Sequence, residues 1–128
     1  MVHFNEHQDE DCQWLGLQGL LGKKWSLPLL LELKNGEISF NQLRKKTSNR
    51  INPTLLSSVL KQLIRLNIVQ KEIKGNSFYK LTTAGSDLVH ILMLMKDWAK
   101  EHHLVIKDDC KNKSCLECEF FIGQKIRF

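Results

Sequence analysis

The positions of apolar and polar residues divide this 128-residue chain into short segments with helical or strand periodicity. Apolar residues at three- and four-residue spacing predict a first amphipathic helix over residues 12–22. A second helix is predicted to follow, with Ser26 as its N-cap and Pro28 in its first turn, where a missing N–H costs no hydrogen bond. The dipeptide Asn35-Gly36 is typical of a helix end and is expected to terminate this second helix.

The strongest helix signal lies in the middle of the chain. Asn52 precedes Pro53, which is the usual arrangement of an N-cap followed by the first helical residue. Apolar residues then recur at helical spacing as far as residue 66, polar residues occupy the opposite side, and Asn67 is expected to close the helix. Before it, a short extended piece leads to Ser39, which is predicted to start a short helix that ends in the basic residues 44–46.

A hairpin and a long helix complete the pattern. Residues 68–82 alternate as two strands around a tight turn at 74–77. Thr83 or Ser86 is expected to cap a last helix that reaches about His103. Because this helix is apolar over more than one face, one side is expected to pack on its own domain while the other needs a partner.

This order of elements is that of a winged helix-turn-helix. The predicted fold class is α+β, mostly α, with the helix at 52–66 entering the major groove, the hairpin as the wing and a long C-terminal dimerisation helix. Residues 1–103 are expected to form the DNA-binding and dimerisation domain, and residues 104–128 a cysteine-containing tail.

Charge supports a polyanion-binding middle. The net charge is +5, but residues 23–83 carry twelve basic and three acidic residues, net +9, whereas residues 1–22 are net −4. A solvated lysine-rich surface is the alternative.

No apolar run approaches the roughly 20 residues of a membrane helix, and residues 1–11 lack the features of a secretory signal, so a cytoplasmic protein without a membrane partner is expected. No catalytic motif is present, which predicts that the chain is not an enzyme.

Several segments, in order, resemble the HxlR-type winged-helix regulators of the MarR-like superfamily. They are LLGKKWS at 20–26, LLEL at 30–33, FNQLR at 40–44, YKLTTAG at 79–85 and Trp98, and the resemblance spans roughly residues 12–103. It implies a homodimeric, sequence-specific transcription factor that binds operator DNA. The turn of the wing is shorter than is usual in that family, and Asn67 stands where the family usually has Gly.

Short polar and basic side chains near the start of the 52–66 helix suit contacts to base edges, and lysines and arginines around them suit phosphates. The residues expected to bind double-stranded DNA are Arg44, Lys45, Arg50, Asn52, Thr54, Ser57, Ser58, Lys61, Lys71, Lys74, Asn76 and Lys80. Two alternatives remain open. In the first, the polar helix face is an ordinary solvated face. In the second, the winged helix is a protein-interaction module that does not bind DNA.

The cysteines form a separate set of candidates. Cys110, Cys115 and Cys118 have metal-ligand-like spacing in the tail, and Cys12 lies near the start. A zinc or iron–sulfur site, a thiol/disulfide redox pair and inert reduced thiols are all compatible with this spacing. A zinc or iron–sulfur site would also be compatible with a small metal or redox protein. The family resemblance implies a redox role for Cys12, because some HxlR-type members use an N-terminal cysteine as a switch.

Overall fold

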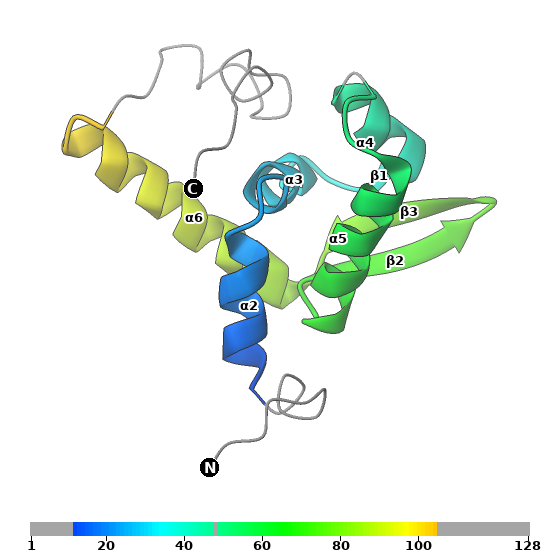
Figure 1. Cartoon of the computed structure of the whole chain (residues 1–128), viewed down its shortest axis with the longest axis horizontal. Helices are drawn as coiled ribbons and strands as arrows, with labels where there is room; N and C mark the ends of the chain where they lie inside the picture. The colour runs from blue at the N-terminus through cyan, green and yellow to red at the C-terminus, as the bar shows by residue number, and fades with distance from the viewer. Residues whose placement is uncertain (1–11, 48, 105–128) are drawn as a thin grey trace.

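The computed structural model describes residues 12–47 and 49–104, which fold into a mostly helical α+β domain with a protruding hairpin and a long last helix (Figure 1). This is the winged helix-turn-helix order that the sequence predicts. The elements are α2 (Gln13–Leu21), α3 (Ser26–Leu33), β1 (Ile38–Ser39), α4 (Phe40–Lys46), α5 (Pro53–Arg65), β2 (Val69–Lys74), β3 (Asn76–Leu81) and α6 (Thr83–Glu101).

The sheet is small and antiparallel, with β3 between β1 and β2. In the hairpin, Lys74 pairs directly with Asn76, so Gly75 is the single residue between the strands. Gly75 has φ of +77°, a conformation that glycine adopts without a steric penalty. The predicted tight turn at 74–77 is therefore placed correctly, but the strands extend further into it than expected.

The core lies where α3 and α5 meet the sheet and α6. Leu29 and Leu30 of α3 and Leu56, Leu60 and Leu63 of α5 are buried almost completely. In Figure 1, α3 sits between α6 on one side and α4, α5 and the sheet on the other, and it contacts both β3 and α6. This buried seam fixes the orientation of α5, because its apolar stripe has one place to pack.

Two predicted N-caps are confirmed. The Ser39 hydroxyl accepts a hydrogen bond from the Gln42 amide at 3.1 Å, and the Gln42 side chain accepts one from the Ser39 amide at 3.0 Å, which completes a capping box at the start of α4. The Asn52 side chain accepts from the Thr54 amide at 2.7 Å at the start of α5. At the end of the same helix, Asn67 adopts φ of +61°, as expected of a closing residue.

Two other predicted caps are wrong. Ser26 is the first residue of α3 and not its cap, because the preceding turn already pairs the Ser26 amide with the Lys23 carbonyl at 3.2 Å. The Ser26 hydroxyl is buried, and it has no hydrogen-bond partner among the described residues. The cap of α6 is neither Thr83 nor Ser86 but Thr82, whose hydroxyl accepts from the Gly85 amide at 2.9 Å.

Thr82 also joins α6 to the base of the wing. Its hydroxyl oxygen lies 2.6 Å from the carbonyl oxygen of Asn67, to which it donates, and 3.1 Å from that of Ile68. The side chain is buried, so these bonds are shielded from water. The start of β2, the end of β3 and the first turn of α6 thus meet at one residue.

Candidate nucleic-acid interface

The exposed face of α5 is the centre of the candidate interface. Leu56, Val59, Leu60 and Leu63 anchor the opposite face in the core. The outward side carries residues that the sequence predicted to bind DNA together with Arg65, and a shallow hollow of about 540 Å³ lies over it. The hollow is lined by Pro53, Thr54, Ser57, Ser58, Lys61, Gln62 and Arg65. Because the buried apolar stripe fixes the orientation of α5 on the domain, these polar side chains all face outward from the same side of the helix.

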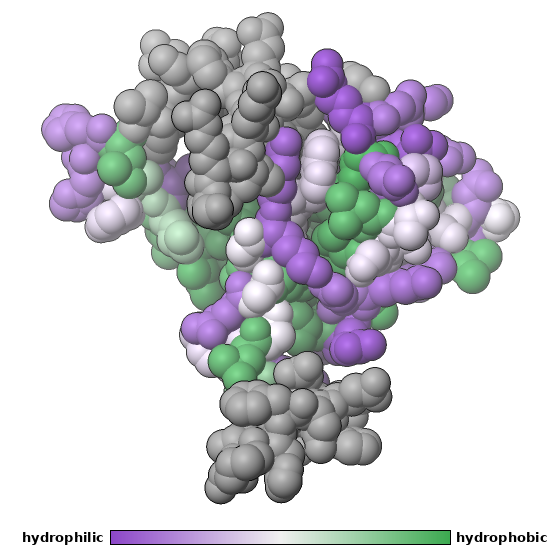
Figure 2. Space-filling view, viewed as in Figure 1, coloured by the Kyte–Doolittle hydropathy of each residue, from purple (hydrophilic) through white to green (hydrophobic). Residues whose placement is uncertain are grey.

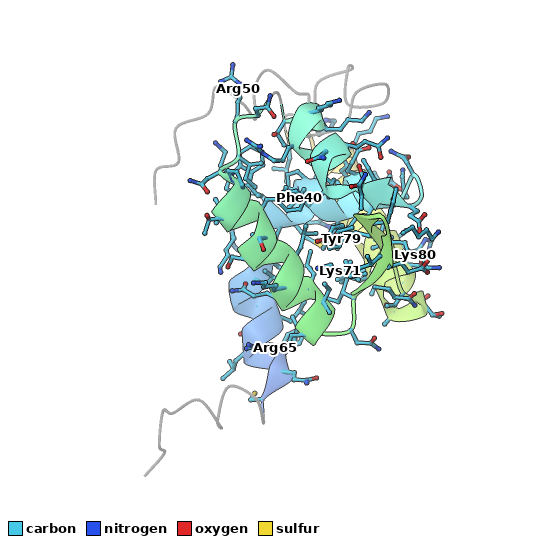
Figure 3. All side chains as sticks on the ribbon, turned by 90° about the vertical axis from the view of Figure 1, so that its right-hand side faces the viewer. Phe40, Arg50, Arg65, Lys71, Tyr79 and Lys80 are labelled. Atoms are coloured by element: carbon cyan, nitrogen blue, oxygen red, sulfur yellow. The ribbon has the colours of Figure 1, made fainter. Side chains whose placement is uncertain are left out.

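Cationic residues lie at both ends of this face. In Figure 3, Arg50 lies beyond the N-terminal end of α5 and Arg65 lies at its C-terminal end. Arg50, Lys61 and Arg65 are exposed, and none of them forms an ion pair with another described residue. Free guanidinium and ammonium groups at a helix surface are the groups that bind phosphates.

The last turn of α4 contributes two further predicted residues. Lys45 is exposed, whereas Arg44 is half-buried and its Nε atom is buried with no hydrogen-bond partner among the described residues. The two side chains therefore have different surroundings. Lys45 is open to solvent, while Arg44 is held partly within the domain.

The wing differs from the expectation, because acidic neighbours pair with its lysines. The Lys74 ammonium lies 3.1 Å from Glu37 and 3.4 Å from Glu72, and Lys80 lies 3.1 Å from Glu72. The hydrogen bond and charge of Lys80, followed by those of Lys74, lower the pKa of the Glu72 carboxyl, and the bond to Glu37 raises the pKa of Lys74. The positive charge of Lys74 and Lys80 is thus largely compensated.

Two predicted wing residues remain without such pairing. The Lys71 ammonium lies 6.0 Å from the centre of the Tyr79 ring and makes no ion pair among the described residues, and Asn76 is exposed beside the turn. Figure 3 places Lys71 on the side of the wing near α5 and Lys80 on the outer side. Lys71 is therefore the wing lysine best placed to extend the α5 surface.

The residues that the sequence predicted to bind DNA did not include two cationic residues of this surface. Arg65 follows Lys61 by four residues, so helical spacing alone was enough to place both on one face. Lys23 had no such signal, because it comes from the turn after α2. Its ammonium donates a hydrogen bond to the Gln62 side chain at 3.0 Å, across 39 residues of sequence.

A second, apolar surface runs along α6. Val89 and Leu92 are buried in the domain, whereas Ile91, Leu94 and Trp98 are exposed, as the two-sided pattern of the sequence predicted. Figure 2 shows hydrophobic residues along α6 on the left of the molecule, away from the wing. Trp14 and Leu15 of α2 are exposed as well.

Of the four cysteine candidates, one lies within the described residues and three lie outside them. Cys12 is a half-buried free thiol at the N-terminal end of α2. Cys110, Cys115 and Cys118 lie outside the described residues. Within residues 12–47 and 49–104, no three His, Cys, Asp or Glu side chains come close enough together to hold a metal ion. The helices in these same ranges are too short or too polar to cross a bilayer.

Comparison with known proteins gives consistent results. A family model described as HxlR-like helix-turn-helix matches residues 20–106. The uncharacterized HTH-type transcriptional regulator YdeP of Bacillus subtilis (strain 168) is 27% identical over 105 residues, which cover 79% of this chain and 81% of that protein. The crystal structure of quinone-bound YodB from B. subtilis has a TM-score of 0.58 and 28% identity, over 70% of this chain and 99% of that one.

A more distant structure shows the same fold. It is the homodimeric winged helix-turn-helix DNA-binding domain of Mb0332 from Mycobacterium bovis, a possible ArsR-family regulator, with a TM-score of 0.59 and 21% identity. The match covers 84% of this chain and 100% of that one.

Proposed function

Because this chain belongs to the HxlR-like helix-turn-helix family of non-enzymatic, DNA-binding transcriptional regulators, we propose that it recognises a specific operator as a homodimer. In this proposal α5 enters the major groove of double-stranded DNA. Ser57, Ser58 and Lys61 reach base edges there, while Arg50 and Arg65 hold phosphates on either side. Lys71 contacts the backbone next to α5.

The observation that carries the proposal is the division of α5 into two faces. Its apolar side is buried, while its outward side combines short hydroxyl side chains with cations that have no carboxylate partner among the described residues. A face of this composition exposes hydrogen-bonding groups small enough to approach base edges, and it carries the charge that displaces counterions from DNA.

The homodimer is proposed on the apolar surface of α6. Exposed Ile91, Leu94 and Trp98 form a continuous strip at helical spacing, and an apolar strip of this kind is stabilised by burial against a second copy. Two identical DNA-binding faces would then read two half-sites, about one helical turn of DNA apart. The homodimeric Mb0332 domain has the same fold.

A titration with DNA tests the proposal. Fragments of the upstream region of the protein's own gene should bind more tightly than scrambled fragments, and the logarithm of the affinity should fall linearly with the logarithm of salt concentration. Lys61→Ala should weaken specific binding, whereas Lys100→Ala, at the far end of α6, should leave it unchanged. Equal affinity for every sequence, or no binding at low salt, would contradict the proposal.

Thiol or metal responsiveness is a further part of the proposal. YodB, which shares 28% identity with this chain, has a quinone-bound structure, and Cys12 is a free thiol in the described part of this protein. Oxidation with diamide should reduce operator binding by the wild type, and Cys12→Ser should remove that response. If Cys110, Cys115 and Cys118 bind zinc or an iron–sulfur cluster, metal analysis and the ultraviolet–visible spectrum of anaerobically purified protein will detect it.

A further inference from the structure

A groove beside the candidate DNA-binding face has no role in the proposed function. It has a volume of about 530 Å³ and lies between α2 and the C-terminal half of α5. Gln13, Gly16 and Gly19 of α2 line one wall, and Arg65 lines the other. Gly19 leaves space where a side chain would stand, since a Cβ atom there would have no neighbour within 4 Å, whereas one at Gly16 would contact the Leu66 side chain at 3.9 Å.

The groove is continuous with the hollow over α5, because Gln62 and Arg65 line both. Lys23 stands at the groove as well, and its ammonium is held by the Gln62 side chain at 3.0 Å. Lys23 and Arg65 are thus the cations of the groove, and Arg65 also belongs to the face that is proposed to bind phosphates. An anion that pairs with Arg65 from the groove competes with DNA for that side chain.

The chain carries a suitable anion immediately next to the groove. Residues 6–11, with the sequence EHQDED, contain four carboxylates and no lysine or arginine. The segment is joined through Cys12 to Gln13, which itself lines the groove. Asp9, Glu10 and Asp11 are two to four residues from Gln13, so an extended chain holds them within about 14 Å of it.

Tethering makes even weak ion pairs effective, because the acidic segment is present at a high local concentration. We infer that residues 6–11 dock in the groove between α2 and α5, pair there with Lys23 and Arg65, and compete with DNA for Arg65. The inference rests on the proposed DNA binding for its consequence, but the docking itself is independent of DNA. The inferred occupant is this chain's own acidic segment. A small anionic molecule bound in the groove in its place would contradict the inference.

The first experiment detects docking without DNA. Asp9→Asn, Glu10→Gln and Asp11→Asn are combined in the full chain, and Asp87→Asn, Asp97→Asn and Glu101→Gln on α6 form a control with the same change in charge. The backbone amide signals of Gly16 and Gly19 and the side-chain amide signal of Gln62 are followed by NMR. The first variant should shift them in the direction that high salt does in the wild type, and the control should leave them in place.

The second experiment measures the consequence for DNA. Surface ion pairs contribute up to about 1 kcal/mol each, so replacing these three carboxylates should raise affinity for any DNA sequence about fivefold at low salt, and less at high salt. Arg65→Gln should remove most of this gain. The inference is overturned if the amide signals do not move, if the α6 control raises affinity equally, or if the gain persists with Arg65→Gln. A protein that binds no DNA but shows the amide shifts would overturn the proposed function and leave the docking intact.

Discussion

Gly85 packs so closely against the backbone carbonyl oxygen of Ile68 that an added Cβ atom would overlap it. The contact brings the first turn of α6 onto the start of the wing. Gly85→Ala should therefore destabilise the protein by about 2–3 kcal/mol, because neither backbone segment has room to move. Thermal unfolding followed by circular dichroism measures the loss.

Gly19→Ala is the matched control for this prediction. Gly19 lies in α2, is exposed, and has open space where the methyl group would stand. Alanine is the better helix former, so this variant should be more stable than the wild type by about 0.5–1 kcal/mol. Equal melting temperatures for the two variants would show that the contact with Ile68 is not as close as described.

Glu72 is predicted to weaken DNA binding by the wing. Its carboxylate pairs with both Lys74 and Lys80, and these ammonium groups lower its pKa, so it remains charged at neutral pH. Glu72→Gln should strengthen binding at low salt and steepen the salt dependence by about one ion, because Lys80 loses its carboxylate partner and can reach a phosphate, whereas Lys74 keeps its pair with Glu37. Glu101→Gln, at the end of α6, is the control, and an unchanged salt slope for Glu72→Gln would rule out a wing contact by Lys80.

Tyr79 allows a spectroscopic test of burial, because it is the sole tyrosine in the sequence. Burial raises the pKa of its phenol above the ordinary value of 10.0, against a smaller effect of a hydrogen bond to Ser77. Tyrosinate absorbance should therefore appear at higher pH in the folded protein than in denaturant. Because the folded pKa is the higher one, the folded state binds the phenolic proton more tightly than the unfolded state does. The stability contributed by this proton is complete below about pH 10 and is lost as pH rises through the folded pKa. Coincident titrations in the two states would contradict the burial.

The α6 surface predicts a change of oligomeric state. Ile91→Glu places a charge in the apolar strip and should convert a dimer into monomers in sedimentation experiments. Ile73→Glu is a matched control, because Ile73, which is 75% exposed on the wing, is at least as accessible as Ile91 at 54%. Dimers that persist in the first variant, or dissociate equally in both, would place the interface elsewhere.

The fold was largely predictable because its signals are local. The helix starts at Asn52-Pro53 and Ser39 and the closing Asn67 each depend on contacts within a few residues, and each is confirmed. The failed cap at Ser26 reflects a local turn that closes at Lys23, whereas the failed cap of α6 depends on a neighbour remote in sequence. Thr82 is preferred over Thr83 and Ser86 at the start of α6 because its hydroxyl also reaches the carbonyl of Asn67, which no periodicity reveals.

The candidate site was predictable in its helix but not in its charge balance. Helical spacing placed Ser57, Ser58 and Lys61 on one outward face. The pairing of Lys74 with Glu37 and of Lys23 with Gln62 joins residues 37 and 39 positions apart. Such contacts depend on how the turn after α2, the sheet and α5 assemble, so counting charges along the chain overestimated the positive charge available on the wing.

Thr82 fixes the bend between β3 and α6. It is the single residue between β3 and α6, and its buried hydroxyl bonds to both sides of the bend. In the proposed dimer, α6 would set the relative tilt of the two copies, and the bonds of Thr82 join α6 directly to the base of the wing. The distance between two DNA-binding faces would then depend on the geometry of this one threonine, and Thr82→Val would widen the range of half-site spacings that a dimer can bind.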